Sequence, residues 1–83
     1  MAETCVVRTP DLGATTPIRV SAWLVEAGET VRAGDRLVEL LLPGLTYDVP
    51  APVSGWLIDI REAANAEVGP GDVLCHIREA DDV

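Results

Sequence analysis

The sequence predicts an all-β fold, and three observations support that class. Apolar and polar residues alternate with period two in several short stretches, whereas no window of helical length repeats with period 3.6. Gly, Pro, Asp or Asn bounds each stretch, as expected where strands end in turns. The chain has 83 residues, 48% of them hydrophobic, which is enough for one small domain and too few for a multidomain enzyme.

In the first half of the chain, alternation predicts strands over Thr4–Thr9, which is followed by a proline, and over Thr16–Val25, which is followed by Glu26-Ala27-Gly28. A brief extended segment is expected near Val31. The strand Arg36–Leu42 follows a Gly-Asp turn.

In the second half, Leu45–Val49 is expected to pair with the preceding strand as a hairpin, because only a Pro-Gly pair separates the two. Gly55–Arg61 and Val73–Arg78 are the remaining long strands, with a brief extended segment near Val68 between them. We expect a single domain over residues 1–83, with its core within 5–78 and an acidic tail, 79–83, that frays.

An internal repeat relates the two halves. Residues 23–40 align with residues 60–77 at an offset of 37, and five of the eighteen pairs are identical. A rival alignment of Ser21–Val25 with Ser54–Ile58 breaks down further along the chain. Neither half can bury its apolar face alone, so we expect two sheets packed as a small sandwich or flattened barrel with approximate two-fold symmetry. The hairpin would then lie at one end and the chain termini at the other.

The charge balance excludes several kinds of partner. Fourteen acidic residues stand against six basic ones, a formal net charge of −8, and every basic residue is arginine, with no lysine in the chain. Nucleic acids and anionic membranes attract clustered Lys and Arg, so neither is expected as a partner. No apolar run reaches the roughly 18 residues of a membrane helix, and the amino end lacks a basic region followed by an apolar stretch. We expect a soluble, cytoplasmic protein.

The cysteines and the histidine do not form a chemical site by sequence. Cys5 and Cys75 could form one disulfide but not a disulfide-rich scaffold, and together with His76 they lack the spacing of a metal site. Cys75 is expected in the core and His76 facing water, since neighbouring strand residues point to opposite faces. That arrangement also leaves both thiols without a general base, so no catalytic residue is assigned.

Two further pairs of residues are better explained by structure than by chemistry. Asp35 and Asp72 each follow a glycine at equivalent positions of the two halves, so they are expected to bond to the local backbone rather than to act as an acid and base. Trp23 and Trp56 are expected to fill or cover the core, because the chain has no Phe and one Tyr.

Four motifs in order carry a resemblance to a known family: Pro10-Asp11-Leu12-Gly13, then residues 23–31 from Trp23 to Val31, then 34–40, then Val49-Pro50-Ala51-Pro52-Val53-Ser54-Gly55. Together they resemble the lipoyl domain of 2-oxoacid dehydrogenase acyltransferases, within the broader biotinyl/lipoyl attachment family. The resemblance covers about residues 5–78. It implies a flattened barrel of two four-stranded antiparallel sheets, with a cofactor-bearing lysine at the exposed tip of the hairpin that joins the halves.

At the positions of the family's Asp-Lys tip, this sequence has Pro43 and Gly44. No lysine is available elsewhere, and an arginine guanidinium is no acylation nucleophile at neutral pH, so we expect neither lipoate nor biotin to be carried in the family's way and assign no cofactor. Pro43 and Gly44 suit the second and third positions of a type II turn. The tip is either a rigid loop rebuilt for another purpose or the foldable remnant of a carrier.

The tip also predicts an interaction site. If Glu39 faces water, period two exposes Leu41 as well, beside Leu45 and Tyr47, as an apolar knob; the alternative is a bulge that buries Leu41. Such exposed apolar patches favour docking to a protein partner. The expected interaction tip comprises Leu41, Leu42, Pro43, Gly44, Leu45 and Tyr47.

The sequence therefore predicts a lipoyl-like domain that is not an enzyme and acts as a protein-interaction or assembly module. By analogy of fold, its partner would be a subunit of a 2-oxoacid dehydrogenase-type multienzyme complex or another copy of the chain. One alternative is a carrier component that holds its group elsewhere, for example on a Cys thiol. Another is a small-ligand binder, for which so flat a barrel leaves little room.

Overall fold

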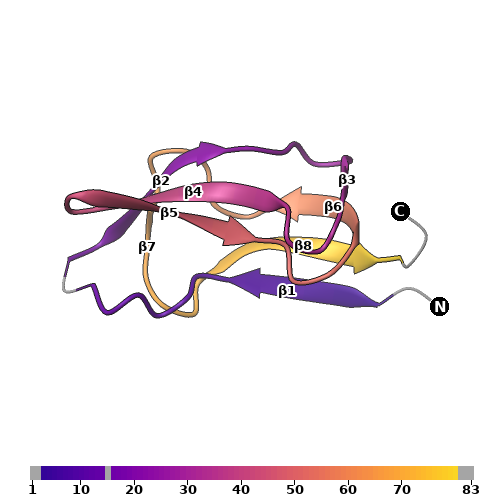
Figure 1. The fold of residues 1–83 in the computed structure, drawn as a ribbon, viewed down its shortest axis with the longest axis horizontal. Coiled ribbons are helices and arrows are strands. Elements are labelled where there is room, and N and C mark those ends of the chain that lie inside the picture. Colours follow the sequence, from indigo (N-terminus) through magenta and orange to yellow (C-terminus); the bar gives the residue numbers. More distant parts are fainter. Residues whose placement is uncertain (1–2, 15, 81–83) are drawn as a thin grey trace.

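The computed structural model describes residues 3–14 and 16–80, and the chain is all-β throughout these ranges (Figure 1). No helix within them is long and apolar enough to cross a membrane. Every expected strand forms, the two brief ones included. The strands are β1 Thr4–Arg8, β2 Ile18–Trp23, β3 Thr30–Val31, β4 Arg36–Leu42, β5 Leu45–Pro50, β6 Gly55–Ile60, β7 Glu67–Val68 and β8 Val73–Glu79.

The end of β8 differs from the expectation. Glu79 is the last residue of the strand, and its backbone N–H donates to the Glu3 carbonyl at 2.7 Å. The Ala80 N–H donates to the Ser54 carbonyl at 3.0 Å. The expectation that the tail frays is therefore wrong for residues 79 and 80, because both are bonded to the backbone of other segments; residues 81–83 lie outside the described part of the chain.

Two four-stranded antiparallel sheets make up the fold, as expected. The first sheet has the order β1-β8-β6-β3 and the second the order β5-β4-β2-β7. Read in these orders, the equivalent strands of the two sheets are β1 and β5, β8 and β4, β6 and β2, and β3 and β7. The two halves are therefore related by a pseudo-two-fold axis. The strands β2, β3 and β4 begin 37 residues before β6, β7 and β8, which confirms the offset of the repeat and excludes the rival alignment.

Hydrogen bonds repeat with the same symmetry. Gly28 N donates to Leu57 O at 2.6 Å, and its counterpart Asn65 N donates to Val20 O at 2.7 Å. The two Gly-Asp turns also match, since the carboxylates of Asp35 and Asp72 each accept a backbone N–H three residues earlier at 2.8 Å. The prediction that these aspartates bond to the local backbone is confirmed.

The core lies between the two sheets and consists mainly of aliphatic side chains. Trp23 is half-buried against it, and its indole Nε1–H donates to the Glu62 carbonyl at 2.7 Å, in agreement with its expected role as a lid. Trp56 is 38% exposed on the outer side of the first sheet, so the expectation that it fills or covers the core is wrong. Its strand position is one whose side chain points away from the other sheet. The most completely buried large side chains are Ile18, Leu37, Leu40, Leu57, Leu74 and Ile77.

The molecule is elongated, with principal extents of 40 × 19 × 19 Å. Figure 1 shows the β4–β5 hairpin at one end, while β1 begins and β8 ends at the other. This is the arrangement that the symmetry of the sequence predicts.

Candidate interaction site at the hairpin tip

The tip is a two-residue turn, Pro43-Gly44, between the paired residues Leu42 and Leu45. Gly44 has φ of 79°, the left-handed value that the third position of a type II turn requires. Proline holds φ near −65°, so the usual two-residue hairpin turns, which need a positive φ at their first central residue, are unavailable here. The predicted turn is therefore present.

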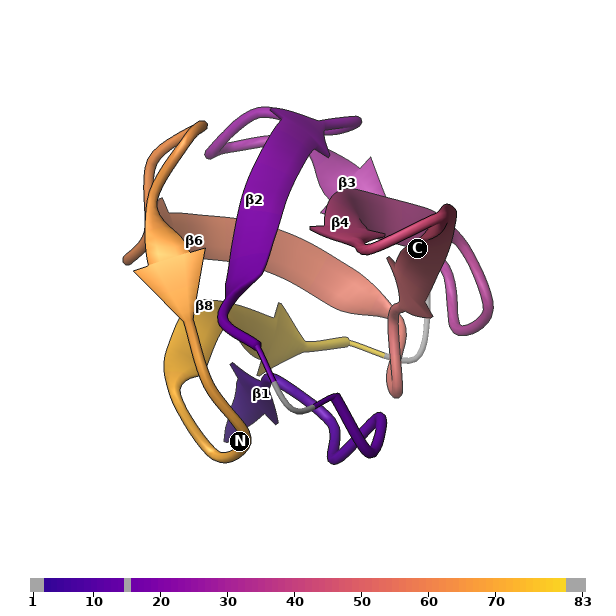
Figure 2. The same cartoon turned by 90° about the vertical axis from the view of Figure 1, so that its left-hand side faces the viewer.

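The tip projects because the neighbouring strand stops short of it. The ladder between β2 and β4 reaches only Arg19 and Leu41, so the last residues of the β4–β5 hairpin extend beyond β2. In the first sheet the equivalent ladder runs one pair further, to Gly55 and Glu79. Figure 2 views the molecule from the hairpin end. The pseudo-symmetry thus breaks at the place where a functional tip is expected.

The apolar side chains of the tip are exposed but point to two faces. Leu41 is 45% exposed and Leu45 56%. Leu41 lies opposite Thr46 in the β4–β5 ladder, whereas Leu45 lies opposite Leu42. Residues directly opposite each other point to the same face of a sheet, so Leu41 faces outward while Leu45 lies on the side of the buried strand positions.

Tyr47 lies opposite the buried Leu40, on the same side as Leu45, and is also exposed. The expectation of one knob that joins Leu41 with Leu45 and Tyr47 is therefore wrong: the hairpin separates Leu41 from the other two. Leu42 is buried, so it supports the turn from below and adds nothing to the exposed surface of the expected tip.

A bulge in β4 explains this arrangement. The β4–β5 register shifts between Arg36 and Val38, which leaves Leu37 as an extra residue with its side chain fully buried. From Val38 onward the alternation is regular, so Leu41 stays exposed. The sequence alone leaves open a bulge that buries Leu41; the observed bulge lies near the start of β4 and leaves Leu41 exposed.

No charged residue lies between Leu40 and Tyr47 in a chain that carries a net charge of −8. Along the hairpin itself, the first charged groups below the tip are Glu39 and Asp48, which lie opposite each other, and Asp48 forms an ion pair with the Arg36 guanidinium at 3.3 Å. The tip is therefore an uncharged, apolar projection on an acidic molecule.

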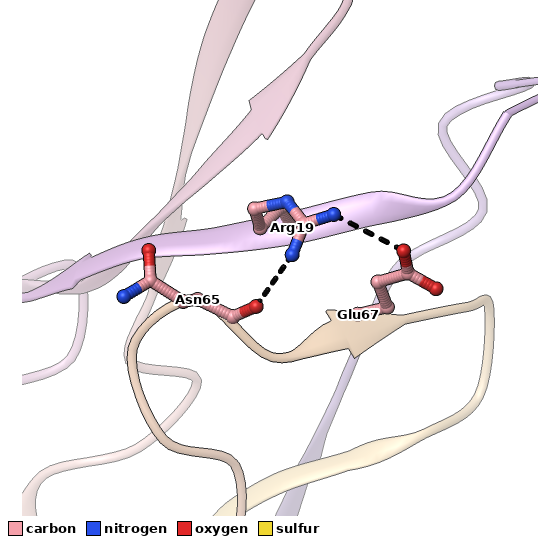
Figure 3. A network of polar contacts seen from close by, with 3 residues as sticks. All are labelled: Arg19, Asn65 and Glu67. Carbon is pink, nitrogen blue, oxygen red and sulfur yellow. Dashed lines mark hydrogen bonds and ion pairs between the residues drawn. The ribbon is translucent and has the colours of Figure 1, made fainter.

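Beside Leu41, the guanidinium of Arg19 is occupied by the neighbouring segment (Figure 3). Its Nη1 donates to the Asn65 carbonyl at 2.7 Å, and its Nη2 lies 3.1 Å from Glu67 Oε1. These contacts hold β7 against β2. Because Glu67 neutralises the Arg19 guanidinium beside Leu41, the base of the tip attracts neither cationic nor anionic groups strongly.

The tip offers little chemistry. Its only polar side-chain groups are the hydroxyls of Thr46 and Tyr47, and the sequence has no lysine. Among residues 3–14 and 16–80, no group of three or more His, Cys, Asp or Glu side chains is placed to hold a metal ion. The arrangement suits contact with another surface rather than bond making.

The thiols lie away from the tip and are poorly suited to reaction. Cys75 is fully buried, and burial, reinforced by the negative charge of Asp59, raises its pKa to about 12. Burial and the nearby Glu79 carboxylate also raise the pKa of Cys5, which is half-buried. Both cysteines are free thiols, and the prediction that Cys75 lies in the core is confirmed.

His76 points to the opposite side from Cys75, as predicted, but it is half-buried rather than simply solvated. Its Nδ1–H donates to Asp59 Oδ1 across the β6–β8 ladder at 2.7 Å. This hydrogen bond is the main reason why the pKa of Asp59 is lowered, and the charges of His76 and Arg61 add to it. Sequence analysis missed the pair because its members are 17 residues apart and meet only when the strands align.

Comparison with known proteins gives consistent matches. The family model of the biotin/lipoyl domain, described as "Biotin-requiring enzyme", matches residues 5–77. The dihydrolipoyllysine-residue acetyltransferase component of the pyruvate dehydrogenase complex of Azotobacter vinelandii is 38% identical over 72 residues, which cover 87% of this chain and 11% of that protein. The corresponding component of the acetoin cleaving system of Bacillus subtilis is 32% identical over 63 residues, 76% of this chain and 16% of that protein.

A solved structure shows the same fold. A single-chain, multi-domain long-chain acyl-CoA carboxylase superposes on 94% of this chain with a TM-score of 0.80 at 20% sequence identity, and the match covers 7% of that chain. The curated relatives are also much longer, since this chain spans 11% of the Azotobacter protein.

Proposed function

The chain belongs to the biotin/lipoyl attachment family, and from that premise we propose that it is a lysine-free member that acts as a non-catalytic protein-interaction module. The observation that carries the proposal is the hairpin tip, which keeps a projecting turn with exposed apolar side chains but has Pro43-Gly44 at its end. In this module the tip makes contact with a partner instead of carrying a swinging group.

The chemistry of attachment supports this reading. A lipoyl or biotinyl amide is formed on a primary amine at the end of a long flexible side chain, and lysine alone provides one. The six basic residues are all arginines, whose guanidinium groups stay protonated and do not attack acyl donors at neutral pH. The turn itself is rigid, because proline restricts one of its two central residues. A rigid tip suits docking better than group transfer.

The partner we propose is a subunit of a 2-oxoacid dehydrogenase-type complex. The relatives support this choice, since they are named as components of pyruvate dehydrogenase, 2-oxoglutarate dehydrogenase and acetoin cleaving systems. An apolar contact is expected, because an uncharged tip avoids the repulsion that the acidic remainder of the chain would cause.

Single substitutions at the tip test the proposal. Leu41→Asp and Leu45→Asp each place a charge on one face of the hairpin, and Leu24→Asp is the matched control, because Leu24 is 46% exposed and lies outside the tip. Binding to purified components of the 2-oxoacid dehydrogenase complexes of the same host is measured for each variant. We expect at least one tip variant to lose binding while the control retains it.

The two tip variants also identify the docking face, because Leu41 and Leu45 point to different sides. Equal binding by the wild type and both tip variants, or an equal loss in Leu24→Asp, would remove the tip from the proposal.

Intact mass spectrometry separates this proposal from its alternative, a carrier with a group on a thiol. These 83 residues, expressed in the native host, should show no mass beyond the 8.8 kDa of their own sequence. The burial of Cys75 and the raised pKa of both thiols already disfavour the alternative. A covalent adduct of lipoyl or biotinyl mass would contradict the proposal, whatever residue carries it.

A further inference from the structure

The outer face of the first sheet carries a second exposed surface. Strand pairing aligns Thr4, Arg78 and Trp56 in one row across β1, β8 and β6, and Val6, His76 and Asp59 in the next. Ile58 is the extra residue of a bulge in β6 and is exposed beside these rows. We call this surface the Trp56 face; it comprises Val6, Trp56, Ile58, Asp59, Arg61, His76 and Arg78.

The Trp56 face is cationic although the molecule is acidic. Arg78 lies directly opposite Trp56, and the Arg61 guanidinium lies 3.6 Å from the Asp59 carboxylate. Asp59 carries the one carboxylate among the residues that define the Trp56 face, and its Oδ1 already lies 2.7 Å from His76 Nδ1. Among residues 3–14 and 16–80, no carboxylate lies within 4.0 Å of the Arg78 guanidinium.

The pseudo-symmetry shows that the fold does not require this composition. At the offset of 37, the positions of Trp56 and Arg78 correspond to Arg19 and Leu41 of the second sheet. There, Arg19 is neutralised by Glu67. In the second sheet, these two positions hold an ion-paired arginine and a leucine. In the first sheet, they hold an exposed tryptophan and an arginine with no described carboxylate partner.

We propose that the Trp56 face binds an acidic peptide segment that also carries apolar side chains, supplied by a partner protein. Tryptophan and arginine are the residue types that contribute most to binding at protein interfaces. Val6 and Ile58 add exposed apolar side chains to this face, and Arg78 lies directly opposite Trp56. The net charge of −8 opposes an acidic ligand at long range, but screening limits that repulsion to about 8 Å at physiological salt.

A second copy of the chain is a poorer occupant of this face. Two such faces brought together about a two-fold axis would place like charges in contact, which opposes self-association. The site is also independent of the hairpin tip, because the row of Thr4 and Arg78 lies at the end where β1 begins and β8 ends, opposite the hairpin (Figure 1). Either site can fail without the other.

A titration followed by nuclear magnetic resonance tests the proposal. The probe is a short synthetic peptide that alternates Glu with Leu, added to the isotope-labelled chain. We expect the Trp56 indole signal and the amide signals of β1, β6 and β8 to shift, while those of residues 41–47 remain unchanged. Peptides that alternate Glu with Ser, and Lys with Leu, are expected to bind much more weakly, since each lacks one of the two features.

Charge-reversal variants provide the control. Arg78→Glu should weaken binding by about tenfold or more, and Trp56→Ser by a similar factor. Arg36→Glu changes the net charge by the same amount as Arg78→Glu, but Arg36 is a largely exposed residue of the second sheet, so that variant should bind like the wild type. Circular dichroism establishes that every variant is folded before its affinity is compared.

Three results would overturn the proposal. The first is an absence of shifts on the Trp56 face at millimolar peptide. The second is an equal loss of affinity in Arg78→Glu and Arg36→Glu, which would show a response to net charge alone. The third is sedimentation of the free chain as a dimer that Trp56→Ser dissociates, which would make a second copy the occupant.

Discussion

Replacing Gly55 with alanine is expected to destabilise the fold severely, because no space exists for a side chain there. Gly55 pairs with Glu79 at the end of the β6–β8 ladder. A β-carbon on Gly55 would overlap the Arg78 carbonyl oxygen and lie 2.8 Å from the Arg78 carbonyl carbon and 3.0 Å from the Glu79 Cα. All three are backbone atoms, so no side chain can rotate away, and β6 and β8 must separate.

The magnitude follows from the contacts that this separation would break. Overpacking alone costs about 1–3 kcal/mol. The end of the ladder also carries the hydrogen bond from Ala80 N to Ser54 O, on the β6 side, which is worth about 1 kcal/mol. We therefore expect Gly55→Ala to lower the free energy of unfolding by about 3 kcal/mol, equivalent to a fall in Tm of roughly 12–24 °C for a domain of this size.

Urea unfolding followed by tryptophan fluorescence measures this loss, and Gly69→Ala is the matched control. The nearest atom to a β-carbon at Gly69 is Asp72 Oδ2 at 4.0 Å, and the equivalent position of the first half is Arg32, which already carries a side chain. The control should change stability by less than about 1 kcal/mol. A loss below about 1 kcal/mol in Gly55→Ala would refute the argument from the close approach of the strands.

Three further predictions concern the turn, the carboxylate and the thiol. Gly44→Ala should cost about 1 kcal/mol in the same assay, because alanine resists the φ of 79°, whereas Gly44→Asn should cost less; equal stabilities would contradict the assigned turn. The pKa of Asp59 is lowered in the folded state, so its contribution to stability is present above its ordinary value of 3.8 and is lost as the pH falls through the folded value. The urea midpoint of His76→Ala, whose side chain has no hydrogen-bond donor, should therefore fall less steeply below that pH than the wild type's. Cys75 should resist a thiol reagent at neutral pH until urea unfolds the chain, because it is buried and its pKa is about 12, and rapid labelling of the folded protein would contradict this.

Much of the fold could be predicted because its signals are local or repeated. The Pro43-Gly44 pair identifies the hairpin, and the offset of 37 identifies which strands are equivalent, so the pairing of the halves follows without long-range information. The aspartates Asp35 and Asp72 illustrate the same point, since each bonds to a backbone group three residues away.

The directions of individual side chains were harder to predict. A bulge at Leu37 shifts the alternation of β4 by one residue, and another at Ile58 does so in β6. The interaction tip was predicted as a segment, but its division between Leu41 and Leu45 depends on which residues lie opposite each other in the β4–β5 ladder. Trp56 was misplaced for a related reason, because its environment consists of residues from β1 and β8 that are distant in sequence.

The amino-acid sequence alone determined the all-β class, the two-fold repeat, the rigid turn and the absence of an amine for attachment, since each depends on residue type and spacing along the chain. Only the tertiary structure decided that the tip presents two separate apolar faces and that Arg78 lies beside Trp56. These features arise where strands from distant segments align, and a shift of one residue in that alignment moves a side chain to the opposite face.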